Sequence, residues 1–219
     1  AFDFRTPTLC RHTCGYFLMT RNDRDYLASC IVEPMVILGL TMKPFSLGHL
    51  MILTRFENAF LVPELPGEPL RNPIKFQDLI FGVFTCAHTF ENALDSFQDE
   101  TTGRKIKRWG RKVGKFNFEE KAKLFSDYLK DGMRGPEDIV LSEGEKTNLP
   151  LFGVLKYVVQ SSFGLTTSEV LNMPYRQLLW EYYIAQEAKG NCKISDPDVV
   201  SNAKEMADKF DAMVRKNAG

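Results

Sequence analysis

The chain has 219 residues, enough for one large domain or two small ones whose core needs neither disulfides nor metal. Lys plus Arg and Asp plus Glu both number 28, so the net charge of zero argues against attraction of the whole molecule to nucleic acid or to an anionic membrane. Five cysteines are an odd number, which excludes a fully paired disulfide framework and favours reduced thiols in a cytosolic compartment.

Neither the start of the chain nor its apolar segments indicate secretion or membrane insertion. Residues 1–4 lack the basic head and apolar run of a signal peptide, and resemble a mature N-terminus after removal of an initiator Met. The apolar stretch at 26–54 is interrupted by Glu33-Pro34 and Lys43-Pro44 before it reaches the roughly 18 residues of a membrane span. We therefore expect no membrane association.

The first third of the chain predicts a small hairpin followed by a helix. The charged residues at 21–25 indicate a turn, within a segment that otherwise shows no clear periodicity. In residues 35–43, β-branched and apolar residues flank Gly39 and predict a β-hairpin. Ser46 then acts as an N-cap, and we expect a helix over about 47–57.

Four further helices are expected after a proline-rich loop at 63–73, in which four prolines within eleven residues exclude regular structure. Apolar residues recur at helical spacing from residue 75, and Thr89 restarts the helical pattern. Asn117 is followed by Glu120, which is typical of a capping box. The expected helices span about 75–87, 89–97, 102–115 and 118–131.

A linker is predicted at residues 132–148, which contain four glycines or prolines and four acids but few apolar side chains. We place the domain boundary near Glu143. The sequence thus predicts an N-terminal α-rich domain with a β-hairpin at 1–143 and a C-terminal helical domain at 144–219. The expected fold class is mainly α, a helical bundle-like protein with a small β-hairpin in its N-terminal third.

The C-terminal domain is expected to consist of helices that end in a helical hairpin. Pro150 opens a helix that ends at Gly164, and Thr166 or Thr167 caps one short helical turn. Two longer helices follow, over about 174–190 and 197–216. The last one has a single broad apolar stripe that would pair with the helix before it. The stripe contains Val199, Val200, Ala203, Met206, Ala207, Phe210 and Val214.

Aromatic residues of the helix at 174–190 are the main candidates for a surface that binds another protein. This helix carries more apolar area than one partner helix covers, and ordinary core packing is the competing interpretation. Ile106, Trp109 and Val113 form a second apolar stripe on the basic helix at 102–115. The candidate partner-binding residues are Tyr175, Leu179, Trp180, Tyr183 and Trp109.

The basic helix at 102–115 has seven cations between Arg104 and Lys115 and no acid. Its sequence from Gly110 to Lys115 differs from a phosphate-binding loop, which needs four residues between its glycines and a Ser or Thr after the lysine. Contact with nucleic acid or a membrane surface is one interpretation. Neutralisation by acids on neighbouring helices is the other, and the overall charge balance favours it. These acids are Glu91, Asp95, Asp99, Glu100, Glu119 and Glu120.

No complete catalytic or metal-binding motif is present. The chain has no Gly-x-Ser-x-Gly, His-Glu-x-x-His, dinucleotide-binding or EF-hand sequence, so we expect no enzyme, cofactor or catalytic residue. His49 is best interpreted as a histidine at the edge of the core. The strongest metal-like pattern has no common zinc spacing, and buried thiols beside a satisfied histidine are the preferred interpretation. It consists of Cys10, His12, Cys14, Cys86 and His88.

Four short runs, in order along most of the chain, resemble proteins encoded in tail-gene clusters of bacteriophages and prophages, which are usually labelled tail assembly chaperones. The resemblance implies a non-enzymatic protein that binds other tail components, such as the tape-measure protein, through apolar helical faces in the host cytoplasm. A structural component of the virion neck, connector or tail is an alternative, and a zinc-binding protein or enzyme is another. The runs are residues 43–49 (KPFSLGH), 108–111 (RWGR), 132–137 (GMRGPE) and 164–182, with Gly164-Leu165, Met173-Pro174 and Trp180-Glu181-Tyr182.

Overall fold

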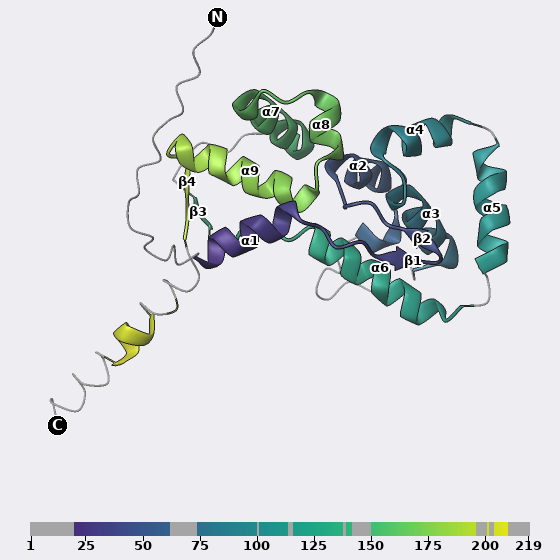
Figure 1. Ribbon diagram of the computed structural model, residues 1–219, viewed down its shortest axis with the longest axis horizontal. Helices are drawn as coiled ribbons and strands as arrows, with labels where there is room; N and C mark the ends of the chain where they lie inside the picture. The colour runs from purple at the N-terminus through teal and green to yellow at the C-terminus, as the bar shows by residue number, and fades with distance from the viewer. Residues whose placement is uncertain are drawn as a thin grey trace, which may run out of the picture.

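The computed structural model describes most of the chain as helices with two small antiparallel sheets, which confirms the expected fold class (Figure 1). The residues described are 20–61, 74–99, 101–113, 116–137, 139–141, 150–195, 201 and 204–209. The first half contains α1 (Arg21–Cys30), β1 (Val36–Ile37), β2 (Leu40–Thr41), α2 (Leu47–Arg55), η1 (Ala59–Leu61), α3 (Phe76–Cys86), α4 (Phe90–Gln98) and α5 (Thr102–Val113). The second half contains α6 (Phe118–Gly132), β3 (Ile139–Leu141), α7 (Leu151–Phe163), α8 (Thr167–Asn172), α9 (Tyr175–Ala188) and β4 (Cys192–Ile194).

The helices form two groups that meet at α2 (Figure 1). One group holds α3, α4, α5 and α6, with α5 at the outer edge of the molecule. The other holds α1, α7, α8 and α9, with the β3–β4 pair beside α9. Within the described ranges, no helix combines the length and the apolar character that crossing a bilayer requires.

Local signals place several helix ends where the sequence predicts them. The Ser46 hydroxyl accepts a hydrogen bond from the backbone N–H of His49 at 3.3 Å, so it caps α2. The Asn117 side chain caps α6 in the same way through the N–H of Glu120. Gly164 ends α7 in the left-handed conformation, with a φ of 67°.

The expected hairpin is present, with Val36 opposite Thr41 and Ile37 opposite Leu40. Both turn residues have positive φ, 52° at Leu38 and 78° at Gly39. A two-residue turn of this kind matches the twist of the strands, and glycine adopts it without steric cost. Because Leu38 is buried, its side chain stabilises a backbone conformation that a leucine rarely adopts.

The predicted charged turn at 21–25 is wrong, because these residues form the first half of α1. The Thr20 hydroxyl accepts from the N–H of Asp23 at 3.1 Å, and the Asp23 carboxylate accepts from the N–H of Thr20 at 2.9 Å. This reciprocal capping box starts the helix with polar residues, which explains why the segment resembles a turn. The helix then packs on α9, where Tyr26 meets the ring of Trp180 edge-on at 6.1 Å.

The segment after α6 is packed rather than linker-like in its described part. The guanidinium groups of Arg21 and Arg134 both bind the carboxylate of Glu137, at 2.9 and 2.7 Å. A Cβ added to Gly135 would lie 3.2 Å from Leu179 on α9, so the chain passes close to that helix. The next residues form β3, which pairs with β4 in an unexpected sheet, with Ile139 opposite Ile194.

One hydrophobic core includes residues from both sides of the predicted boundary at Glu143, which itself lies among residues 142–149, outside the described residues. Phe45 is at the centre of this junction. Its carbonyl accepts from the N–H of Tyr175 at 2.6 Å, and its ring meets Tyr128 and Tyr175 edge-on. A Cβ on Gly132 would lie 2.6 Å from the Cβ of Phe45, so only glycine allows this approach.

The predicted pairing of the last helix with α9 can be checked at Met206, and it is not seen there. Residues 204–209 are helical, but Met206, which should face α9, is 73% exposed. A strand, β4, follows α9 instead, and α9 packs on α7 and α1. The other residues of the expected stripe lie outside the described residues or, for Ala207, are exposed: Val199, Val200, Ala203, Ala207, Phe210 and Val214.

Candidate binding pocket

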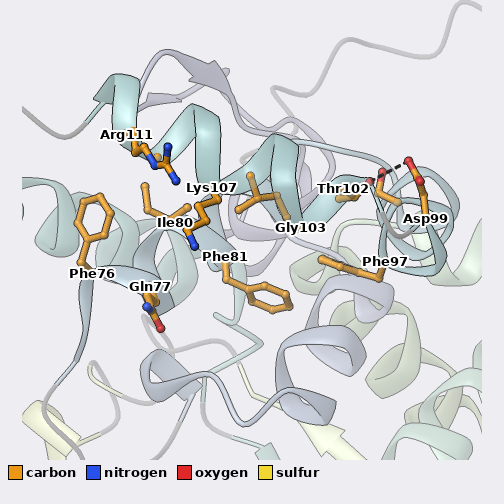
Figure 2. Close-up of a pocket in the computed structure, with 13 residues that line it drawn as sticks. Phe76, Gln77, Ile80, Phe81, Phe97, Asp99, Thr102, Gly103, Lys107 and Arg111 are labelled. Carbon is orange, nitrogen blue, oxygen red and sulfur yellow. Dashed lines mark hydrogen bonds between the residues drawn. The ribbon is translucent and has the colours of Figure 1, made fainter.

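A pocket of about 730 Å³ opens between α3, α4 and α5, and we call it the α5 pocket. Its apolar wall comes from Phe76, Ile80 and Phe81 on α3, from Phe97 on α4 and from Ile106 on α5. Figure 2 shows α5 along one side of the pocket, facing Phe76, Gln77 and Phe81 across it. Pockets of this size between helices are common binding sites.

The pocket exists because α3 is apolar on more faces than the core covers. Leu79, Val83 and Cys86 are buried in the core, while Phe76 and Phe81 remain partly exposed on the opposite side. Phe81 and Phe97 hold each other in place, with ring centroids 5.0 Å apart. The result is a fixed aromatic wall that α5 covers only in part.

The two glycines of α5 mark how its distance from α3 differs between the two ends of the pocket. A Cβ on Gly110 would lie 3.6 Å from Ile80, in ordinary contact, so the helices nearly touch at this end. A Cβ on Gly103 would meet no atom within 4 Å, so the pocket stays open at the other end. Trp109 of α5 packs against the core, with its ring centroid 6.4 Å from that of Phe84 on α3, and it does not line the pocket.

Cationic side chains line one end of the α5 pocket and have no acidic partner among the described residues. Lys107 and Arg111 are lining residues, close to Phe76 and Gln77 in Figure 2. Among the cations of α5, Lys105 pairs with Asp99 at 3.3 Å. In the part of the chain that the structure describes, the side chains of its other cations form no ion pair or hydrogen bond. These are Arg104, Lys107, Arg108, Arg111 and Lys112.

Neutralisation by neighbouring helices, the preferred interpretation of the sequence, therefore applies only to Lys105 in the described structure. Two of the acids near α5 in the sequence have other partners. The Glu91 carboxylate accepts from Ser168 and Asn172 on α8, and these hydrogen bonds lower its pKa. Glu120 pairs with Lys121 at 2.7 Å. Glu91 and Glu120 lie close to α5 in the sequence, but their carboxylates interact with α8 and α6 instead.

The opposite end of the pocket carries Asp99, whose carboxylate is already satisfied. It accepts from the hydroxyl of Thr101 at 2.6 Å and from the backbone N–H of Thr101 at 2.8 Å. These two hydrogen bonds, the hydroxyl first, lower the pKa of Asp99 to about 2. The pocket therefore has one end with cations that are unpaired within the described residues, and another end with a hydrogen-bonded carboxylate.

The lining residues offer binding groups rather than a catalytic set. No histidine or cysteine is among the described residues that line the pocket, and the one contact there between a hydroxyl and a carboxylate is the 3.3 Å hydrogen bond that Thr102 donates to Asp99. His49 is buried elsewhere, where its Nε2–H donates to the carbonyl of His88 at 2.7 Å and its Nδ1 accepts from the N–H of Ser46 at 3.2 Å. Burial lowers the pKa of His49, so the neutral ring acts as a structural hydrogen-bonding group.

The described residues contain no cluster of three or more metal-ligating side chains. Cys86 is fully buried, and burial raises the pKa of its thiol. The ring of His88 is hydrogen-bonded through Nδ1 to the carbonyl of Phe84 at 2.8 Å. The other residues of the metal-like pattern, Cys10, His12 and Cys14, lie outside the described residues.

The structure does not bring the predicted partner-binding residues together. Trp180 is only 4% exposed and packs on Tyr26, while Tyr175 is buried against Phe45. Leu179, Tyr183 and Trp109 are half-buried, and Trp109 lies on a different helix from the others. In this conformation these side chains stabilise the chain's own fold, and a role in partner binding stays a prediction.

Sequence reasoning missed the pocket because its wall is assembled from three helices. Phe76 and Phe97 look like ordinary members of amphipathic stripes, and Lys107 looks like one cation among several. Gly110 of α5 is the signal in the sequence, since glycine inside a helix is unfavourable and so points to a close neighbour, which here is Ile80.

Comparison with known proteins gives no match to this chain among protein families, curated proteins or solved structures.

Proposed function

We propose that this protein is a non-enzymatic assembly protein of a bacteriophage tail or virion, and that it binds another polypeptide in the α5 pocket. The observation that carries the proposal is the pocket itself, which combines a fixed aromatic wall with cations that have no ion-pair partner among the described residues. Such a surface favours a partner that supplies apolar side chains, because burying them in the pocket removes apolar area from water.

The four runs that carry the resemblance to phage tail-cluster proteins fall at two places in the fold. Residues 43–49, 132–137 and 164–182 meet around Phe45, where they form the junction of the core. Residues 108–111 lie on α5 and supply Gly110 and Arg111 to the pocket. The resemblance therefore involves both the packing that builds the fold and the surface to which we assign binding.

Complementation in a phage or prophage that encodes this chain tests the proposal. Deletion of the gene should abolish infectious particles, and the wild-type gene should restore them. Gly103→Trp should fail to restore them, because a Cβ at this lining position meets no protein atom within 4 Å, and we expect the bulky side chain to fill the open end of the pocket. Gly153→Ala, a change at an exposed glycine of α7, serves as the matched control and should restore full yield.

Full particle yield with Gly103→Trp, in a variant shown by circular dichroism to be folded, would contradict binding in the pocket. Normal particles from the deletion strain would contradict an assembly role altogether. Mass spectrometry of purified particles distinguishes the two forms of the proposal. An assembly chaperone is absent from finished particles, and a neck, connector or tail component is present in stoichiometric copies.

A further inference from the structure

We infer that the segment bound in the α5 pocket is an acidic amphipathic helix of the partner. Its apolar face would lie on Phe76, Phe81 and Phe97, and its carboxylates would pair with Lys107 and Arg111. This inference rests on the proposed function and specifies the chemistry of the partner for the same site.

Charge complementarity favours an acidic occupant. The chain as a whole is neutral, yet α5 carries five cations that have no partner in the described structure. Lys107 and Arg111 are one helical turn apart, so both point toward the same side of α5 and line the pocket. A cationic segment would meet repulsion at this end, while a neutral segment would leave both charges unpaired.

The walls of the pocket favour a helical occupant over an extended one. All the lining residues belong to α3, α4 or α5 or lie in the α4–α5 turn, and the backbone groups of these helices are bonded within each helix. No strand in the described part of the chain borders the pocket, so an added strand would find no edge to pair with. A helical partner segment hydrogen-bonds its own backbone N–H and C=O groups, so it can be buried in the pocket without leaving these groups unpaired.

The carboxylate of Asp99, at the other end of the pocket, favours one orientation of the bound helix. Asp99 is held by Thr101 and Lys105 and stays ionised at neutral pH, so it disfavours a second carboxylate nearby. The acids of the bound helix should therefore lie toward Lys107 and Arg111, and its neutral end toward Asp99 and Gly103 (Figure 2).

Binding of three synthetic amphipathic peptides to the full-length protein tests the inference. The peptides share length and apolar positions, and they carry Glu, Gln or Lys at the polar positions near one end. We expect fluorescence anisotropy to give a Kd for the Glu peptide that is lower than that of the Lys peptide by about tenfold or more, since two charge pairs contribute. The preference should weaken as salt is raised.

Charge-reversed variants identify the cations that are responsible. The double change Lys107→Glu with Arg111→Glu should raise the Kd of the Glu peptide by about tenfold or more and should improve binding of the Lys peptide. The matched control is Arg108→Glu with Lys112→Glu, which changes the same charge on the same helix but outside the pocket lining. Its effect should be no more than about threefold. Gly103→Trp should abolish binding of all three peptides.

Three outcomes would overturn the inference. Equal binding of the three peptides would show that charge does not select the occupant. If Gly103→Trp then abolished that equal binding, the proposed function, binding of a polypeptide in the pocket, would still stand. An equal effect of the two double variants would assign the preference to the general charge of α5. Binding of dodecanoate with no binding of any peptide would assign the pocket to a small anionic amphiphile. Failure of the proposed function appears separately, as full complementation by Gly103→Trp.

Discussion

Gly82→Ala tests the packing of α3 against α6 and thus the wall that supports the pocket. Alanine normally stabilises the middle of a helix by about 1 kcal/mol relative to glycine. Here the added Cβ would lie 2.5 Å from Cε1 and 2.6 Å from Cζ of Phe125. Carbon atoms prefer separations of about 3.5–4.0 Å, so the ring would need to move by about 1 Å. Phe125 is fully buried between Phe60 and Tyr128, whose ring centroids are 4.9 and 5.8 Å away, so it has little room to move.

Overpacking costs about 1–3 kcal/mol, and because Phe125 has little room to move we expect the upper part of that range, about 2–3 kcal/mol, which exceeds the helix-propensity gain of about 1 kcal/mol. We expect the free energy of unfolding to fall by about 1–2 kcal/mol. For a chain of this length that corresponds to a lower Tm by about 2–8 °C. Urea denaturation followed by far-UV circular dichroism measures the effect. The control is Gly153→Ala in α7, where the nearest atom would be 4.0 Å away and stability should rise by about 0.5–1 kcal/mol.

The opposite signs of these two glycine changes are the critical result. If both variants are stabilised equally, Phe125 does not pack on Gly82 as described. A double-mutant cycle tests the cause directly, because Phe125→Leu removes the ring atoms that Gly82→Ala contacts. In that background Gly82→Ala should destabilise less than it does in the wild type.

Three further predictions concern buried groups. Burial lowers the pKa of His49, so as pH falls the unfolded chain takes up the proton before the folded one does. The contribution of His49 to the free energy of unfolding is therefore complete above about pH 6.5 and is lost as pH falls below that value. In His49→Gln the urea midpoint should change less between about pH 7 and pH 5 than in the wild type, and an equal slope would exclude His49 as the cause. Trp180→Ala should lower the free energy of unfolding by about 3–5 kcal/mol, because the ring is buried on Tyr26, and unchanged stability would contradict that packing. Alkylation of the native protein, read by peptide mapping, should modify the exposed Cys30 and spare Cys86 until the protein unfolds, since Cys86 is fully buried and its pKa is raised by burial, so early modification of Cys86 would be inconsistent with the core.

Features with a local cause could be predicted from the sequence. Ser46 and Asn117 cap their helices through hydrogen bonds to residues three positions on, and Gly39 supplies a turn conformation that most residues avoid. In each case the signal and its structural effect lie within a few residues of each other. The first hairpin and the α-helices after it up to α9 followed from such signals, whereas α1 did not.

Features with a distant cause could not be predicted. The strand at 139–141 has only three residues, and its partner lies at 192–194, so no local pattern indicates the pairing. The sequence indicates an exposed Trp180 because Tyr26, the residue that covers its ring, lies on α1, and the start of α1 resembles a turn in the sequence. The α5 pocket could not be predicted for the same reason, because its wall comes from three helices that are separate in the sequence. In the sequence α5 resembles an ordinary helix with a solvated basic face.

The pairing of β3 with β4 has a consequence for how the chain can be divided. Residues 144–219 expressed alone would lack β3 to pair with β4 and would lack α1 to cover α9, so this piece is a poor candidate for independent folding. A backbone cut within residues 142–149 is a different matter, because the two fragments would still share the sheet and the contacts at Phe45. The chain is therefore suited to split-protein complementation at this position, where two separately inactive pieces reassemble into one native unit.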